Sequence, residues 1–195
     1  AMTAVSSSEI ENDVEISTGG DGEHALHEVT GEGPIDIVNS GSLTTSGLGS
    51  KGILAESNGA GKITITNNAD ITTQSQNHII QFPTTPESHG IQAINSSTGA
   101  SGGITIDHTG GTITTSAYNS SAIRAESSAS TGDINISSTN ALLNVNGIDS
   151  DGIVAVHTTA MNETSTANIN ITTRGGSIKV LDAPIANLLN KNIYS

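Results

Sequence analysis

The sequence predicts an all-β chain that folds as a right-handed parallel β-helix, a three-sheet solenoid of about five to six coils. The 195 residues include 25 Ile and 25 Thr, which favour strands, and Gly or Asn interrupts every candidate helix. Short Ile-containing segments also recur in a fixed order, which is typical of a repeat architecture. The Ile content argues against disorder, which 2% aromatic residues and a net charge of −13 would otherwise favour.

In the first recurring segment an Ile and an Ala stand two positions apart, with another residue between them. Side chains two residues apart share one face of a strand, so these Ile and Ala residues are expected to point into the core. The segment reads GILAES at 52–57, GIQAIN at 90–95, AIRAES at 122–127 and DGIVAVH at 151–157.

Two further segments complete each repeat. The second segment carries paired Ile residues at 35 and 37, 63 and 65, 104 and 106, 134 and 136, and 169 and 171. The third reads SLTTS at 42–46, DITTQ at 70–74, TITTS at 112–116, ALLNVN at 141–146 and SIKV at 177–180.

The spacing of these segments places them on different sheets. Only 6 or 7 residues separate the second Ile of the middle segment from the first apolar residue of the third, whereas parallel neighbours in one sheet need a connection of about a dozen residues. The short link therefore turns a corner, and each segment stacks on its counterpart in the next coil. The inward residues Thr45, Thr73 and Thr115 are expected to bond one another, with Gly and Asn at the corners. The chirality rule for parallel connections predicts a right-handed coil.

The chain opens with an acidic segment. Residues 1–20 are expected to hold an expression remnant followed by a cap strand, and residues 21–195 to form the β-helix fragment. Alternation puts Glu9, Glu11, Asp13 and Glu15 on one face. We expect this solvated cap to block end-to-end stacking of the first coil. A calcium or basic-partner surface is the alternative, although the carboxylates lack the spacing of an EF-hand.

The charge balance disfavours two kinds of partner. Six Lys and Arg against 19 Asp and Glu argue against nucleic acid or an anionic membrane, and without 18 consecutive apolar residues no membrane insertion is expected. Neither a cofactor nor a metal is expected. His24 and His27 are three residues apart on an expected strand and would face opposite sides, and His27 aligns with His157 in the repeat.

One interval is longer than its counterparts. Ile71 and Ile91 are 20 residues apart, where other coils use 10, and the extra residues include the single Phe of the chain. One hypothesis is a protruding partner-binding loop anchored by Phe82, because aromatic residues concentrate binding energy at interfaces. Its expected contact residues are His78, Ile79, Ile80, Phe82 and Pro83. The alternative is that Ile80 and Phe82 pack over the neighbouring sheet. A second bulge at 158–166 is a weaker candidate.

No catalytic residues are expected. β-Helix enzymes that act on polysaccharides gather carboxylates with Arg or Lys on one outer face, and acid–base chemistry needs such a pair within reach. The candidates are Lys62, Asp107, Arg124 and Asp133. No second carboxylate joins Asp107, whose outward column holds Val38, Thr66, Ser137 and Thr172.

The sequence pattern of the coils resembles that of a known family. Segments of the form G-I-x-A, G-x-I-T-I-x-N and x-I-T-T cover roughly residues 20–187. They are similar to the passenger domains of bacterial type V autotransporters, the pertactin-like β-helices. They resemble Bartonella passengers in particular, a group that includes an angiogenic factor acting on the vascular endothelial growth factor receptor. The absence of Cys agrees, because a passenger crosses the outer membrane unfolded and a periplasmic disulfide would hinder that passage.

The resemblance implies a role but carries over no functional residue. It implies a virulence factor that is exported through the outer membrane and is secreted or held on the bacterial surface. The expected partner is a host cell-surface protein receptor, bound by a monomer, and the most specific form of this expectation is a pro-angiogenic agonist of the vascular endothelial growth factor receptor. The alternatives are an adhesin or antigenically variable surface protein and, third, a polysaccharide-active enzyme.

Overall fold

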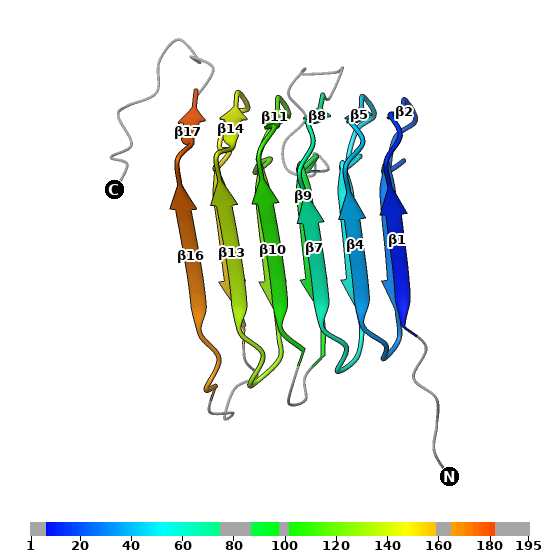
Figure 1. Cartoon of the computed structure of the whole chain (residues 1–195), viewed down its shortest axis with the longest axis vertical. Coiled ribbons are helices and arrows are strands. Elements are labelled where there is room, and N and C mark those ends of the chain that lie inside the picture. Colours follow the sequence, from blue (N-terminus) through cyan, green and yellow to red (C-terminus); the bar gives the residue numbers. More distant parts are fainter. Residues whose placement is uncertain (1–6, 75–86, 98–101, 159–164, 182–195) are drawn as a thin grey trace.

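The chain is a right-handed parallel β-helix, as the sequence predicts. A computed structural model describes residues 7–74, 87–97, 102–158 and 165–181, which form 17 strands arranged in three parallel sheets. Figure 1 shows the coils following one another from β1 (Ser8–Asn12) at one end of the rod to β16 (Ile169–Arg174) at the other. Within the described residues no helix is long and apolar enough to cross a membrane.

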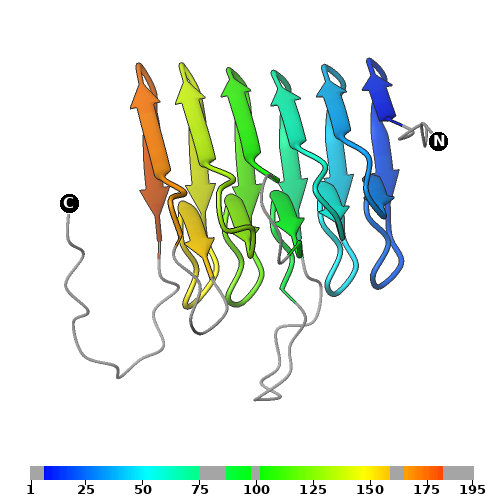
Figure 2. The same cartoon turned by 90° about the horizontal axis from the view of Figure 1, so that it is seen from below.

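Each coil contributes one strand to each sheet, and Figure 2 shows the coils as a row of similar loops. Sheet A contains β1, β4 (Ile35–Asn39), β7 (Ile63–Asn67), β10 (Ile104–Thr109), β13 (Ile134–Thr139) and β16. Sheet B contains β2 (Ile16–Thr18), β5 (Leu43–Thr45), β8 (Ile71–Thr73), β11 (Thr112–Thr115), β14 (Leu142–Val145) and β17 (Ser177–Val180). Sheet C contains β3 (Leu26–Thr30), β6 (Ile53–Ser57), β9 (Ile91–Asn95), β12 (Ile123–Ser127) and β15 (Ile153–His157).

The pairing register aligns the recurring segments residue by residue and confirms the predicted core. Ile63 lies between Ile35 and Ile104 in sheet A, and the Ala column of sheet C includes Ala55 and Ala93. In coils two to five the paired Ile residues of sheet A are at most 2% exposed. Each fully buried Ile contributes about 1.5–3 kcal/mol of hydrophobic free energy. Stacked aliphatic side chains therefore replace the missing aromatic rings.

The acidic segment near the start of the chain forms part of the first coil. Ile10 of β1 pairs with Ile37, and Ile16 of β2 pairs with Leu43, so both extend the core columns. Both are only half-buried, whereas Ile37 is fully buried. The first coil therefore presents a partly covered core at its end of the rod.

The threonine column of sheet B is held differently from the prediction. The Thr45, Thr73 and Thr115 hydroxyls do not bond one another; each donates to the carbonyl oxygen of a serine in the following corner, and Thr73 donates to Ser88 over 2.9 Å. Strands about 4.8 Å apart keep successive hydroxyls too distant for a direct bond. Each threonine therefore ties the end of a sheet B strand to the segment leading into sheet C.

Asparagines form a buried ladder that the sequence interpretation placed only loosely at corners. Asn12 Nδ2 donates to Asn39 Oδ1 over 2.7 Å, and Asn39 Nδ2 donates to Asn67 Oδ1 over 2.6 Å. His108 continues the column, with its Nδ1 2.9 Å from Asn67 Nδ2. Each asparagine also donates to a carbonyl oxygen two residues further on. The ladder thus holds together the corner between sheets A and B across coils.

The type of residue just before each sheet C strand depends on a side chain of sheet B in the next coil. Three coils have Gly there, and an added Cβ would lie only 2.3 or 2.4 Å from an isoleucine Cγ2 atom; these pairs are Gly52 with Ile71, Gly90 with Ile113, and Gly152 with Ile178. The other two coils have Ala, and the sheet B residue is Leu, which has no Cγ2 methyl; these pairs are Ala25 with Leu43 and Ala122 with Leu143. The glycine of the G-I-x-A segment is therefore explained by packing.

Candidate functional site

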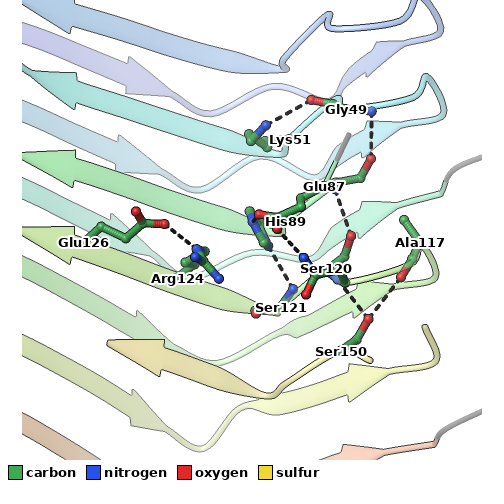
Figure 3. A network of polar contacts seen from close by, with 12 residues as sticks. Gly49, Lys51, Glu87, His89, Ala117, Ser120, Ser121, Arg124, Glu126 and Ser150 are labelled. Carbon is green, nitrogen blue, oxygen red and sulfur yellow. Dashed lines mark hydrogen bonds and ion pairs between the residues drawn. The ribbon is translucent and has the colours of Figure 1, made fainter. Parts of the chain in front are cut away.

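The predicted binding loop lies outside the described residues. His78, Ile79, Ile80, Phe82 and Pro83 all fall in 75–86, so the choice between a binding loop and a packing cover stays a prediction. The described chain resumes at Glu87, in the corner between sheets B and C. A network of polar contacts surrounds that point (Figure 3).

The network is centred on Glu87 and His89. His89 is fully buried, and its Nε2 lies 2.8 Å from Glu87 Oε2. The other carboxylate oxygen of Glu87 accepts a hydrogen bond from the Asn119 side chain, and His89 Nδ1 accepts one from the Ser121 backbone N–H over 2.9 Å. Two of these hydrogen bonds, to Asn119 and Ser121, fix the segment that follows residues 75–86 to the next coil, and the third joins Glu87 and His89 within the segment.

A column of serines extends this network along the rod. The Gly49 N–H donates to Ser88 Oγ over 3.1 Å, the Ser88 N–H to Ser120 Oγ over 2.8 Å, and the Ser120 N–H to Ser150 Oγ over 2.9 Å. Ser150 Oγ in turn donates to the Ala117 carbonyl oxygen over 3.1 Å. Figure 3 shows Gly49, Ser120 and Ser150 of this column on different coils. The corner before sheet C is thus a continuous polar seam.

The protonation of His89 follows from its partners. A backbone N–H can only donate, so Nδ1 is the unprotonated nitrogen and Nε2–H donates to the Glu87 carboxylate. Burial is the main cause that lowers the pKa of His89 to about 4, against the opposing effect of Glu87. Because both ring nitrogens are engaged, neither faces a substrate as a general base. The geometry is that of a structural tie.

The two N-terminal histidines lie close together, which corrects the expectation that they face opposite sides. Their ring centroids are 5.0 Å apart with the rings edge to face. His24 precedes β3 and accepts a hydrogen bond from the Lys51 N–H over 3.0 Å, while His27 Nε2 lies 3.1 Å from Glu56. Burial, followed by the charge of Lys51, lowers the pKa of His24 to about 4. The expected alignment with His157 is also wrong, because the register carries His27 through Leu54 and Gln92 to Arg124 and Val154.

Three of the candidate catalytic residues, Asp107, Arg124 and Asp133, lie in separate surroundings. Asp107 lies on the outer face of sheet A, in register with Thr66 and Ser137 as predicted. Arg124 is on sheet C, where it forms an ion pair with Glu126. Asp133 accepts a hydrogen bond from the Asn168 N–H over 2.7 Å. Across the ranges that the structure describes, no group of three or more His, Cys, Asp or Glu residues is placed to hold a metal ion.

The sequence interpretation missed the network, although a signal for it was present. The serine of the polar seam stands two residues before the Gly or Ala of the first recurring segment, as in SKG at 50–52, SHG at 88–90, SSA at 120–122 and SDG at 150–152. Extending the segment to S-x-G-I-x-A would have indicated a polar column next to the apolar ones. The Glu87–Asn119 contact has no such signal, because it joins residues 32 positions apart.

Comparisons with known proteins do not extend this description: no family model, no curated protein and no solved structure matches the chain. The resemblance to autotransporter passengers therefore rests on the coil segments and on the parallel β-helix that they form.

Proposed function

We propose that this chain is an autotransporter passenger that binds a host cell-surface protein after export through the outer membrane. The observation that carries the proposal is the regular β-helix, whose longest interruption in sequence, between Ile71 and Ile91, includes the tie between Glu87 and the buried His89. A rigid scaffold that presents a loop is a common arrangement in binding proteins. The loop would make contact through Phe82 and its neighbours.

The specific form of the proposal is agonism of the vascular endothelial growth factor receptor. It is supported by the resemblance of the coil segments to Bartonella passengers. Receptor phosphorylation in endothelial cells treated with the purified chain tests it, with heat-unfolded chain as the control. Phosphorylation that follows the dose of folded chain supports agonism, whereas cells that stay silent while binding the chain leave a host receptor of another kind.

The contact residues are tested by substitution in the loop. Phe82→Ala combined with Ile80→Ser should weaken host-cell binding at least about tenfold, the loss of one aromatic anchor, while the melting temperature changes by a few degrees or less. Tyr118→Ala is a matched control, because Tyr118 lies in the equivalent corner one coil further along and pairs with Asp149 over 3.0 Å. A large loss of stability with unchanged binding per folded molecule would show instead that these side chains cover the sheet.

A second candidate, an adhesin or antigenically variable surface protein, is favoured by the outer faces of the sheets. The outward columns of sheets A and B carry mostly Thr, Ser, Asn and acidic residues in stacked rows. An adhesin would use this repeated surface and would tolerate loop substitutions. Binding that survives the Phe82 and Ile80 substitutions but is lost when Thr72 and Thr114 of sheet B are both replaced by Lys favours the adhesin.

A further inference from the structure

The C-terminal end of the described rod exposes its core. Ile169 and Ile171 of β16 and Ile178 of β17 stand in the inward columns, yet 43%, 48% and 46% of their surfaces are exposed. Their counterparts one coil earlier, such as Ile134 and Leu143, are fully buried. Among the residues that the structure describes, β16 and β17 each pair with another strand on one side only. An apolar end with unpaired strand edges is a surface on which another parallel strand can be added.

The two ends of the rod carry opposite charge. Residues 8–23 contain six Asp and Glu and no Lys or Arg, whereas residues 165–181 contain Arg174 and Lys179 and no Asp or Glu. The side chains of Asp13, Glu15, Arg174 and Lys179 are all exposed. An acidic end repels a second acidic end, as expected of a cap, but it attracts the basic end of another copy.

The coil register shows how the two ends would meet. If β1 of one copy takes the next position beyond β16 of another, Ile10 stacks on Ile171, following the column that already runs through Ile37 and Ile136. In the same way Ile16 stacks on Ile178. All strands keep the parallel direction of their sheets, so the ladder of backbone hydrogen bonds continues across the junction.

The same register pairs the charges. In this register Asn12 would lie opposite Thr173. The next residue, Asp13, would therefore lie opposite Arg174. Ser17 would stand on Lys179, and the exposed Glu15 lies two residues before Ser17 along the chain. The two basic side chains of this end thus meet two carboxylates. Sheet C does not take part, for two reasons. Its last described strand, β15, belongs to the coil before β16 and β17, and in β3 Glu28 occupies the inward position that is Ala in the next coil.

We infer that two copies of this chain associate head to tail, with β1 and β2 of one copy added to β16 and β17 of the next. The interface is heterologous, so the same contact repeats and the product is an open, linear assembly. In place of the monomer expected from the sequence, the folded chain forms concentration-dependent oligomers. The inference is independent of the proposed host receptor.

Sedimentation velocity of the full chain over a range of concentrations tests the inference. Wild type is expected to form species larger than a monomer as concentration rises. Ile171→Asp should weaken this association at least about tenfold, because it places a carboxylate opposite Ile10 of the next copy. Val29→Asp is the matched control: Val29 is 49% exposed, close to the 48% of Ile171, but lies on the outer face of sheet C. Circular dichroism shows whether both variants keep the β-helix.

Charge reversal gives a second test that does not depend on the core. A head variant, Asp13→Lys with Glu15→Lys, places two Lys opposite Arg174 and Lys179 of the next copy, and a tail variant, Arg174→Glu with Lys179→Glu, places two Glu opposite Asp13 and Glu15. Each variant alone should associate at least about tenfold more weakly than wild type, and an equal mixture should regain association. A wild type that stays monomeric at every concentration overturns the inference, as does association that none of these substitutions changes.

Discussion

Replacing Gly90 with Ala is expected to lower the free energy of unfolding by about 1–3 kcal/mol, the usual cost of adding a methyl group to a packed core. A Cβ at this position would lie 2.3 Å from Ile113 Cγ2 and 2.6 Å from the Ala122 carbonyl oxygen. Gly90 is not among the residues with positive φ, so the cost is steric and not conformational. Urea denaturation measures it, with Gly31→Ala as the control, because a Cβ at Gly31 would meet no atom within 4 Å.

The reasoning also predicts a rescue. Ile113→Leu removes the Cγ2 methyl and reproduces the natural pair Ala122 with Leu143, in which an alanine Cβ is accommodated. Alone, this substitution should cost less than about 1.5 kcal/mol, and with Gly90→Ala it should recover about 1 kcal/mol or more as a coupling energy. Two results would refute the idea that the residue at position 90 depends on the branching of the side chain at position 113. One is a Gly90→Ala chain as stable as the Gly31→Ala control; the other is a double variant whose loss in the free energy of unfolding equals the sum of the two single losses.

Three other predictions concern buried polar contacts. The contribution of His89 to the free energy of unfolding should fall by about 3 kcal/mol as the pH drops from 6.5 to about 4, because burial lowers the pKa of His89 to about 4 in the folded chain and the unfolded chain therefore binds the proton at higher pH; urea titrations across pH should show a shallower fall for His89→Gln than for wild type. Asn39→Ala should cost about 1–3 kcal/mol by removing the acceptor of one Asn12 bond and leaving Asn67 Oδ1 without its donor, and a loss no larger than that of exposed Ser40→Ala would contradict the ladder. Thr73→Val should lower the thermal stability by about 1 kcal/mol through the lost Ser88 bond; no change would assign the column to packing alone.

The apolar part of the fold could be predicted because period-two alternation and repeat spacing act on every coil. Ile35, Ile63 and Ile104 stand at the same step of each repeat, and stacking in parallel sheets is the arrangement that buries all of them. Alternation gives the face of a strand but not the partner of a polar atom. The prediction that the Thr45 hydroxyl bonds a neighbouring threonine is therefore wrong, because the distance between coils is too large and the Ser50 carbonyl oxygen is the acceptor.

The corner residues were harder to predict for a related reason. Whether Gly or Ala precedes a sheet C strand depends on the branching of a side chain in the next coil, which is known only once the register is known. The His27 alignment failed because it matched letters outside the strand register. Glu87 and Asn119 meet only because the coils stack, and neither residue belongs to a recurring segment.

Saturable binding of the purified, folded chain to host endothelial cells tests the central claim most directly. The account predicts binding that saturates with concentration and is lost when the cells are first treated with trypsin, because the proposed partner is a surface protein. Binding that does not saturate, or that is unchanged after trypsin treatment, would contradict the claim that this β-helix recognises a host protein.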